Sequence, residues 1–339
     1  MEKITYQLPE ELIAQFPLDK RDRCKLLHLD KSTGGLSEYL FSDIVKLLAK
    51  DDLLVMNDTM VQRPRLYGVG GQAGRRCEIF LVEKLSDEEW ICMVRPGKKA
   101  KAGDRFHFSA REYAQIVAVL PDGSRRVKFA GARPEAMMEK YGHVPLPPYI
   151  KREDSIVDRK MYQTVYAKEG FSIAAPTAGM HFSEELLEQI EKMGVELCRL
   201  RLDIGRGTFK PIECKHYDKH KMDAEEYWIS KDAAKQINKA MKKKRRIIAV
   251  GTSTVRALEG CFRKHEEIIA THDETDLFIY PGYEFKVVKA IITNFHLPES
   301  SLLALVAAFA GVEPILNAYQ FAVKNKYRFY SYGDAMLIA

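Results

Sequence analysis

Apolar and polar residues along this chain alternate in blocks that predict strands and helices. Short, fully apolar runs such as residues 53–56 are typical of strands buried on both faces of a sheet. After about residue 160, such runs precede stretches with apolar residues at helical spacing, and helices are predicted to begin near Ser183, Thr254 and Ser300. This alternation of strand and helix predicts a layered α/β domain.

The first sixty residues mix the same two kinds of element. One helix is predicted to begin at Pro9, with acidic residues in its first turn, and another is predicted after Ser42 as its N-cap. A strand is predicted at residues 24–29. The apolar run at 53–56 ends in two polar residues, Asn57 and Asp58, which makes both of them candidates for binding.

Between about residues 63 and 147 the pattern changes to short β-type runs separated by glycine turns. The runs are CEIFLVEKL, EEWICMVR, DRFHF, YAQIVAVL and RRVKFA. Their spacing predicts an antiparallel barrel or sandwich of roughly six strands, which the proline-rich VPLPPYI closes. We therefore predict an α/β catalytic domain formed by residues 1–62 and 150–339, with an antiparallel β-barrel domain inserted at 63–149.

The composition narrows the class of protein. Of 339 residues, 46% are apolar and 29% are charged, as in ordinary globular enzymes. Six cysteines lie far apart without a C-x-x-C pair, which argues against a zinc ribbon, an iron–sulfur site or a disulfide framework. No signal peptide is recognisable, and the longest apolar run reaches about half a membrane span. We expect a cytoplasmic protein without a membrane partner. The net charge of +6 permits an anionic partner without requiring one.

Two patterns look like cofactor or metal motifs but do not fit their context. Residues 68–73 match the letters of a dinucleotide-binding loop, yet a strand-like stretch follows where a helix is needed, so we interpret them as a hairpin turn. His216 and His220 have a spacing that suits a metal on a helix. No third ligand accompanies them and lysines surround them, so a solvated basic segment explains them better.

Four polar segments, three of which contain glycines, follow predicted strands in the second half of the chain, where ligands bind in open α/β sheets. They are residues 174–184, 203–209, 249–256 and 293–300. The first places Thr177 and His181 in a strand-to-helix loop, exposed at the sheet edge, where a histidine can titrate near neutrality. The alternative is a structural turn in which the histidine packs or caps.

The second and third segments offer backbone N–H donors. Gly205 and Gly207 allow a ligand to approach the backbone closely, although a β-bulge explains them equally well. The hydroxyl-rich residues 251–254 precede a helix whose free N–H groups suit a carboxylate or phosphate, or they merely cap that helix.

The last segment and the C-terminus add further polar candidates. Asn294 and His296 follow a strand, Tyr332 either stacks a base or packs in the core, and Asp334 supplies a carboxylate. Basic clusters occur mostly in the predicted barrel, as a surface that contacts phosphates requires, although each alone is explained by a solvated face. They are Arg63 with Arg65, Arg75 with Arg76, Lys98, Lys99 and Lys101, Arg125 with Arg126, and residues 242–246.

These segments resemble, in the same order, the S-adenosylmethionine:tRNA ribosyltransferase-isomerase family of queuosine biosynthesis. The resemblance covers essentially the whole chain. It rests on LIAQFPLDKRD, VMNDTMVQRPRLYG, GHVPLPPYIKR, YQTVYAKEGFSIAAPTAGMHFS, GRGTFKPI, HKMDAEEY, VGTSTVRALE, ETDLFIYPGYEFKVVKAIITNFHLPESSLLALVAAFAG and YRFYSYGDAML. The chain departs from the family pattern at three places. Arg206 stands where a smaller residue is usual, and RLDIG replaces the usual His-Val-Gly lead-in. Ser301 occupies a position where threonine is common.

The resemblance implies an α/β domain with an inserted β-barrel and a specific reaction. The ribosyl unit of S-adenosylmethionine is transferred to 7-aminomethyl-7-deazaguanine at the tRNA wobble position and isomerised. Adenine and methionine leave, and the product is epoxyqueuosine-tRNA. S-adenosylmethionine is then a consumed cosubstrate, and no cofactor or metal is expected. The expected partner is a tRNA with a GUN anticodon, and we expect a monomer.

The candidate residues fall into two groups. His181, His296, Asp334 and Thr177 are expected to be catalytic, with one histidine as general acid or base and Asp334 or Asp58 orienting a partner. Residues 205–209 are expected to line the adenosine pocket, and the 251–254 loop with Arg256 to hold a carboxylate or hydroxyls. The substrate-binding candidates are Asn57, Asp58, Arg63, Gly205, Gly207, Thr208, Phe209, Gly251, Thr252, Ser253, Arg256, Asn294 and Tyr332.

Two other functions fit the composition. An RNA methyltransferase would use the same cosubstrate, but it would release S-adenosylhomocysteine instead of adenine. A non-catalytic RNA-binding protein would bind tRNA tightly without turnover. The length and order of the matching strings favour the ribosyltransferase-isomerase over both.

Overall fold

The computed structural model describes residues 3–71, 74–205, 212 and 216–339, and the chain divides into two compact units. The first unit comprises residues 1–61, 147–153 and 160–339. The second comprises residues 62–146 and 154–159, so it is inserted into the first.

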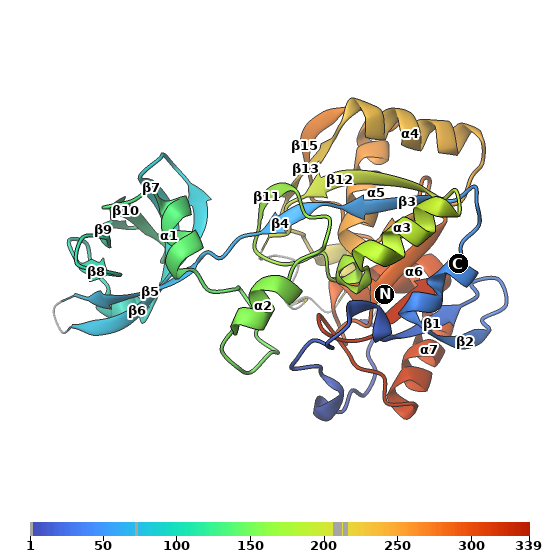
Figure 1. Ribbon diagram of the computed structural model, residues 1–339, viewed down its shortest axis with the longest axis horizontal. Coiled ribbons are helices and arrows are strands. Elements are labelled where there is room, and N and C mark those ends of the chain that lie inside the picture. Colours follow the sequence, from blue (N-terminus) through green and yellow to red (C-terminus); the bar gives the residue numbers. More distant parts are fainter. Residues whose placement is uncertain (1–2, 72–73, 206–211, 213–215) are drawn as a thin grey trace. The chain divides into compact units, whose positions relative to one another are not determined.

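A nine-stranded mixed sheet forms the centre of the first unit (Figure 1). Its strand order is β15-β13-β12-β3-β14-β16-β17-β1-β2. The strands are β1 Lys25–Leu29, β2 Leu36–Leu40, β3 Leu53–Asn57, β12 Glu196–Leu202, β13 Glu225–Ile229, β14 Ile247–Val250, β15 Thr271–Thr275, β16 Ala290–Asn294 and β17 Ala335–Ile338. Strands β12, β3, β14 and β16 run parallel to one another, so their carboxyl ends meet at one edge. A separate parallel pair joins β4 Thr59–Val61 and β11 Glu169–Ser172.

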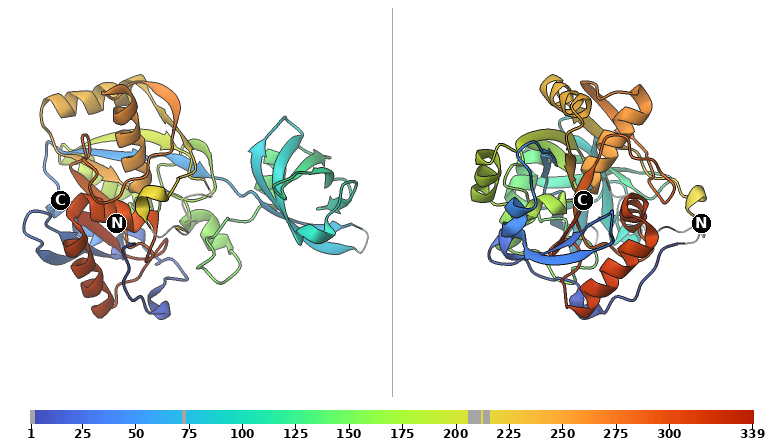
Figure 2. Two further views of the ribbon diagram at one scale, coloured as in Figure 1. Left: turned by 180° about the vertical axis from the view of Figure 1, so that it is seen from behind. Right: turned by 90° about the vertical axis from the view of Figure 1, so that its right-hand side faces the viewer.

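Helices cover both faces of this sheet (Figures 1 and 2). They are α3 Glu184–Lys192, α4 Lys231–Lys242, α5 Thr252–His265, α6 Ser301–Ala310 and α7 Val312–Lys324. Successive side chains of β3 alternate between the faces: Leu53 and Val55 pack with α4–α7, and Leu54 and Met56 pack with α3. Burial on both sides explains why the central strands are continuous apolar runs. The predicted layered α/β domain is confirmed.

The second unit is a closed antiparallel barrel of six strands in the order β10-β7-β6-β5-β8-β9. The strands are β5 Arg65–Gly70, β6 Arg75–Lys84, β7 Glu89–Arg95, β8 Arg105–His107, β9 Tyr113–Val119 and β10 Arg125–Ala130, followed by α1 Pro134–Tyr141. The predicted inserted β-barrel is confirmed. Strands β5 and β6 are antiparallel neighbours, so the described part of the 68–73 motif, residues 68–71, lies in β5 and just after it and precedes a strand, whereas a dinucleotide-binding loop precedes a helix. Residues 72 and 73 lie outside the described residues.

Two predicted helices near the N-terminus are wrong in type. Instead of a helix that begins at Pro9, the chain makes one 3-10 turn, Glu10–Leu12, because the backbone of Leu12 and Ala14 bonds to Phe329. The segment after Leu40 is a 3-10 helix, Phe41–Lys46, without a side-chain cap from Ser42. At Glu10–Leu12, tertiary contacts therefore outweigh the local helical pattern.

The remaining short elements are η2 Arg21–Arg23, η4 Gly97–Lys99, α2 Ile156–Met161, η5 Thr177–His181 and η7 Tyr217–Lys219. Within the described ranges, no single helix is long and apolar enough to cross a membrane, although α6 and α7, bent by 116° at their junction, meet that criterion as a pair.

Candidate functional site

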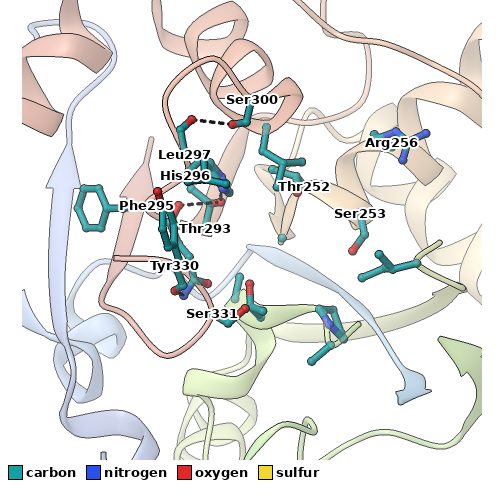
Figure 3. Close-up of a pocket in the computed structure, with 18 of the residues that line it drawn as sticks. Thr252, Ser253, Arg256, Thr293, Phe295, His296, Leu297, Ser300, Tyr330 and Ser331 are labelled. Atoms are coloured by element: carbon teal, nitrogen blue, oxygen red, sulfur yellow. Dashed lines mark hydrogen bonds between the residues drawn. The ribbon is translucent and has the colours of Figure 1, made fainter. Parts of the chain in front are cut away.

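A cavity of about 350 Å³ lies in the first unit at the carboxyl ends of β14 and β16. Its walls come from four loops that are far apart in sequence, together with single residues of neighbouring segments (Figure 3). The lining residues are Tyr149, Ala175, Pro176, Thr177, Ala178, Ile204, Ile212, Glu225, Gly251, Thr252, Ser253, Arg256, residues 293–300, Leu302, Tyr330 and Ser331. Carboxyl ends of parallel strands are the usual ligand site of open α/β sheets, and the volume suits a small molecule.

The N-terminus of α5 forms one wall of this cavity. Gly251 is the N-cap residue, with a φ of 87°, and no side chain caps the first turn. The hydroxyl of Thr254 donates to the Val250 carbonyl, and that of Ser253 accepts from the Asn57 amide at 3.1 Å. The first N–H groups of α5 are therefore available to an anion in the cavity.

A buried ion pair, Arg256 with Glu225, lies beside this helix end. Both side chains are less than 5% exposed. Arg256 also donates to the carbonyls of Leu277 at 3.1 Å and Thr275 at 3.2 Å, so three of its five N–H groups have protein acceptors. The Glu225 carboxylate also accepts the Gly205 N–H at 2.9 Å. Glu225 therefore fixes both Arg256 and the backbone at Gly205.

His296 lies in the wall opposite α5 (Figure 3). Its Nε2 is 2.8 Å from the Thr293 hydroxyl, and its backbone N–H donates to the Tyr319 hydroxyl at 3.0 Å. Burial lowers the pKa of His296 to about 3. The imidazole is thus neutral at physiological pH. The neighbouring Phe295 ring turns away from the cavity and packs against Tyr319.

His181 lines a second, smaller cavity of about 30 Å³ together with Cys24 and Tyr332. The prediction that His181 is exposed is wrong: it is 5% exposed, because the η5 turn packs it against Phe41 and sets its Nδ1 3.2 Å from the Cys24 sulfur. Burial lowers the pKa of His181 to about 4, and the adjacent Asn294 side chain opposes that shift.

Asn294 and Ser331 connect the two cavities. Asn294 lines the larger cavity, interacts with His181 and donates to the Tyr330 carbonyl at 2.9 Å. Ser331 lines both cavities, and its hydroxyl is 2.7 Å from that of Tyr149. The larger cavity thus brings together Thr177, His296, Asn294, the 251–253 loop and Arg256, whereas His181 and Tyr332 lie next to it.

Several other predicted site residues lie in neither cavity wall. Asp334 accepts the backbone N–H groups of Lys25 at 2.8 Å and Arg328 at 2.7 Å, which are structural contacts. Asn57 bonds to the backbone of Leu202 and so links β3 with β12. The carboxyl of Asp58 has its pKa raised by burial.

Two groups of predicted residues fall outside the first unit's described part. Arg63 belongs to the barrel unit. Gly207, Thr208 and Phe209 lie outside the described residues.

A comparison with protein families settles the family. Residues 1–338 match the family model described as queuosine biosynthesis protein. The chain belongs to this family.

Curated relatives in this queuosine biosynthesis family are named S-adenosylmethionine:tRNA ribosyltransferase-isomerase. The protein of Halothermothrix orenii is 44% identical over 100% of this chain and 99% of its own length. The protein of Trichlorobacter lovleyi is 44% identical over 100% of this chain and 99% of its own length. The protein of Carboxydothermus hydrogenoformans is 46% identical over 98% of this chain and 98% of its own length. This chain is thus a transferase of the ribosyltransferase-isomerase family.

A solved structure of the same family has the same fold class. The crystal structure of an S-adenosylmethionine tRNA ribosyltransferase from Thermotoga maritima is 35% identical, with a TM-score of 0.56 over 99% of each chain.

In the described part of the present chain, no three His, Cys, Asp or Glu side chains gather as a metal site.

The sequence patterns of this ribosyltransferase-isomerase missed several cavity residues. Glu225 is the main one: HKMDAEEY was recognised as a family string, but its charge partner Arg256 is 31 residues away in sequence. A buried strand that begins with glutamate was the available signal, because an isolated carboxylate is costly to bury. Tyr149, Tyr330 and Ser331 gave no signal beyond their family strings.

Proposed function

We propose that this enzyme transfers and isomerises the ribosyl unit of S-adenosylmethionine onto 7-aminomethyl-7-deazaguanine at the tRNA wobble position. Adenine and methionine are released, and epoxyqueuosine-tRNA is formed. The observation that carries the proposal is the cavity at the strand ends, which combines an open helix N-terminus, a neutral histidine and apolar walls in a chain of this family.

The cavity matches the chemical parts of S-adenosylmethionine. The methionine carboxylate binds the first N–H groups of α5, where the helix dipole favours negative charge. The apolar side chains of Ile204, Ile212 and Leu302 offer contact area for the adenosine. The Glu225 carboxylate accepts hydrogen bonds from both Gly205 and Arg256, and Gly205 is the first residue of the predicted adenosine-binding segment.

His296 is the general base in this proposal. The sulfonium acidifies the 5′ carbon of the ribose, so a base that removes one of its protons leaves an ylide. A neutral imidazole in the cavity wall is in the correct protonation state for that step. Adenine departs with a proton from a donor in the site. These steps require only acid–base groups and hydrogen-bond donors that bind the carboxylate, so we propose no cofactor or metal beyond the consumed cosubstrate.

The RNA partner in this proposal is a tRNA with a GUN anticodon that carries the aminomethyl-deazaguanine base. We propose that the enzyme acts on it as a monomer in the cytoplasm. The names of the relatives support a tRNA substrate, and the net charge of +6 is compatible with one.

A product analysis tests the proposal. The enzyme is incubated with S-adenosylmethionine labelled in the ribose and with precursor tRNA. We expect one adenine and one methionine per labelled, heavier wobble nucleoside. Formation of S-adenosylhomocysteine would instead identify a methyltransferase, and tight tRNA binding without any product would identify an RNA-binding protein.

A further inference from the structure

Nearly all of the excess positive charge of this chain resides in the barrel unit. Its residues, 62–146 and 154–159, include 17 Lys and Arg against 12 Asp and Glu. The rest of the chain has 36 Lys and Arg against 35 Asp and Glu. The barrel therefore holds a net charge of +5 out of +6 in about a quarter of the residues.

This charge is concentrated at one end of the barrel. Strand pairing places the connections β5–β6, β7–β8 and β9–β10 at the same end, which we call the distal end. The chain enters and leaves at the other, proximal end, where Arg65 pairs with His143. Residues 70–71, 74–76, 95–105 and 119–126 at the distal end hold nine cations and two acids. The proximal connections, 83–89 and 107–113, hold two cations and five acids.

The distal cations are exposed and largely free of carboxylate partners. Six define the surface: Arg75, Arg95, Lys98, Lys99, Lys101 and Arg105, all of them exposed. Among the described residues, none of these six makes an ion pair. At the proximal end, by contrast, Lys84 pairs with Glu135, Lys128 with Glu88 and Lys140 with Glu112.

A buried arginine holds the lysine-bearing loop in place. Arg125 is 6% exposed and donates to the carbonyls of Gly97 at 2.7 Å and Ala100 at 3.3 Å, on either side of Lys98 and Lys99. An internal arginine that bonds only to backbone carbonyls fixes the loop without neutralising the charges on it. The loop with Lys98 and Lys99 is thus held in place before any partner binds, which lowers the entropy cost of binding.

We propose that the distal end of the barrel binds the phosphate backbone of the tRNA substrate. Clustered, unpaired and exposed cations are what the release of counterions from a nucleic acid requires. The inference rests on the proposed tRNA substrate and adds which surface grips it. Contacts of this kind position the RNA without reading its bases.

Two matched triple variants test this proposal. Lys98→Gln/Lys99→Gln/Lys101→Gln removes three distal charges, and Lys84→Gln/Lys128→Gln/Lys140→Gln removes three proximal ones. The Kd for precursor tRNA is measured over a series of salt concentrations, after circular dichroism has confirmed folding. We expect the distal variant to bind at least ~10-fold more weakly, with the slope of log Kd against log salt reduced by about two to three. The proximal variant should stay within about twofold of the wild type.

Activity distinguishes this proposal from the proposed function. The distal variant should raise KM for tRNA and keep kcat, because the cavity lies in the other unit. If the wild type releases adenine but both variants have the same Kd and salt slope, only the proposed role of the distal surface is overturned. If the wild type releases no adenine, the proposed function is overturned. A distal variant that loses binding to polyglutamate but keeps tRNA binding would show a surface for an acidic protein and would also overturn the proposal.

Discussion

The two buried histidines can be distinguished by replacement. His296 lines the cavity and His181 lies behind Asn294. We expect His296→Gln to lower kcat by about 10²–10⁴-fold, as the loss of a general base does, while S-adenosylmethionine still binds. His181→Gln is the matched comparison and should lower kcat less than about tenfold. Turnover assays in which the larger loss falls on His181→Gln would assign the base to that residue instead.

The same histidines give the stability a pH dependence of known sign. Burial lowers the pKa of His296 to about 3 and that of His181 to about 4, from an ordinary value of 6.5. At a pH between the lowered pKa and 6.5, the unfolded chain binds more protons than the folded one. The unfolding free energy is therefore highest above about pH 6.5 and decreases as the pH falls. We expect the unfolding free energy to decrease by on the order of 1 kcal/mol per pH unit for each histidine.

Urea unfolding at pH 7, 6 and 5 measures this dependence. His296→Gln should have a shallower pH profile than the wild type, because one of the buried histidines with a lowered pKa is gone. An identical slope in the variant would show that His296 is not held neutral in the fold.

Glu225 is the residue whose loss the structure makes most costly. Replacing it by Gln leaves the Arg256 cation buried and without its charge partner, so we expect a loss of stability of about 3–5 kcal/mol. The KM for S-adenosylmethionine should also rise, because Gly205 loses its carboxylate acceptor. Thermal melts and steady-state assays of Glu225→Gln are compared with those of Glu226→Gln, which alters the exposed neighbour. Equal behaviour of the two variants would contradict the positioning role.

The N-terminus of α5 is the proposed binding site for the cosubstrate carboxylate. Gly251 adopts a φ of 87°, and a Cβ added there would meet Ala178 and Ser253 only at 3.7 Å, so an alanine would strain the backbone without a clash. We expect Gly251→Ala to cost about 1–3 kcal/mol of stability and to weaken S-adenosylmethionine binding, because the N–H groups shift. Gly282→Ala is the control, since Gly282 has a φ of 103° and open space in an exposed turn. Calorimetry that shows equal cosubstrate affinity for both variants would contradict the anion site.

Elements were predictable from sequence where one pattern dominates. The barrel followed from alternating runs and glycine turns, and the central sheet from apolar runs that end in polar loops. The Pro9 helix was mispredicted because pairing with Phe329 competes with the local pattern. The burial of His181 and the pairing of Glu225 with Arg256 depend on contacts between distant segments, which no periodicity encodes.

At the scale of the whole molecule, cavity and surplus charge are in different units. The first unit holds the cavity in which we propose that S-adenosylmethionine binds, and the barrel holds the surplus charge that we propose contacts tRNA. The most direct test is a crystal structure of the enzyme with S-adenosylmethionine bound. We predict the nucleoside in the 350 Å³ cavity, with its carboxylate on the N–H groups of Thr252 and Ser253 and its ribose facing His296. A nucleoside bound elsewhere, with this cavity empty, would contradict the account.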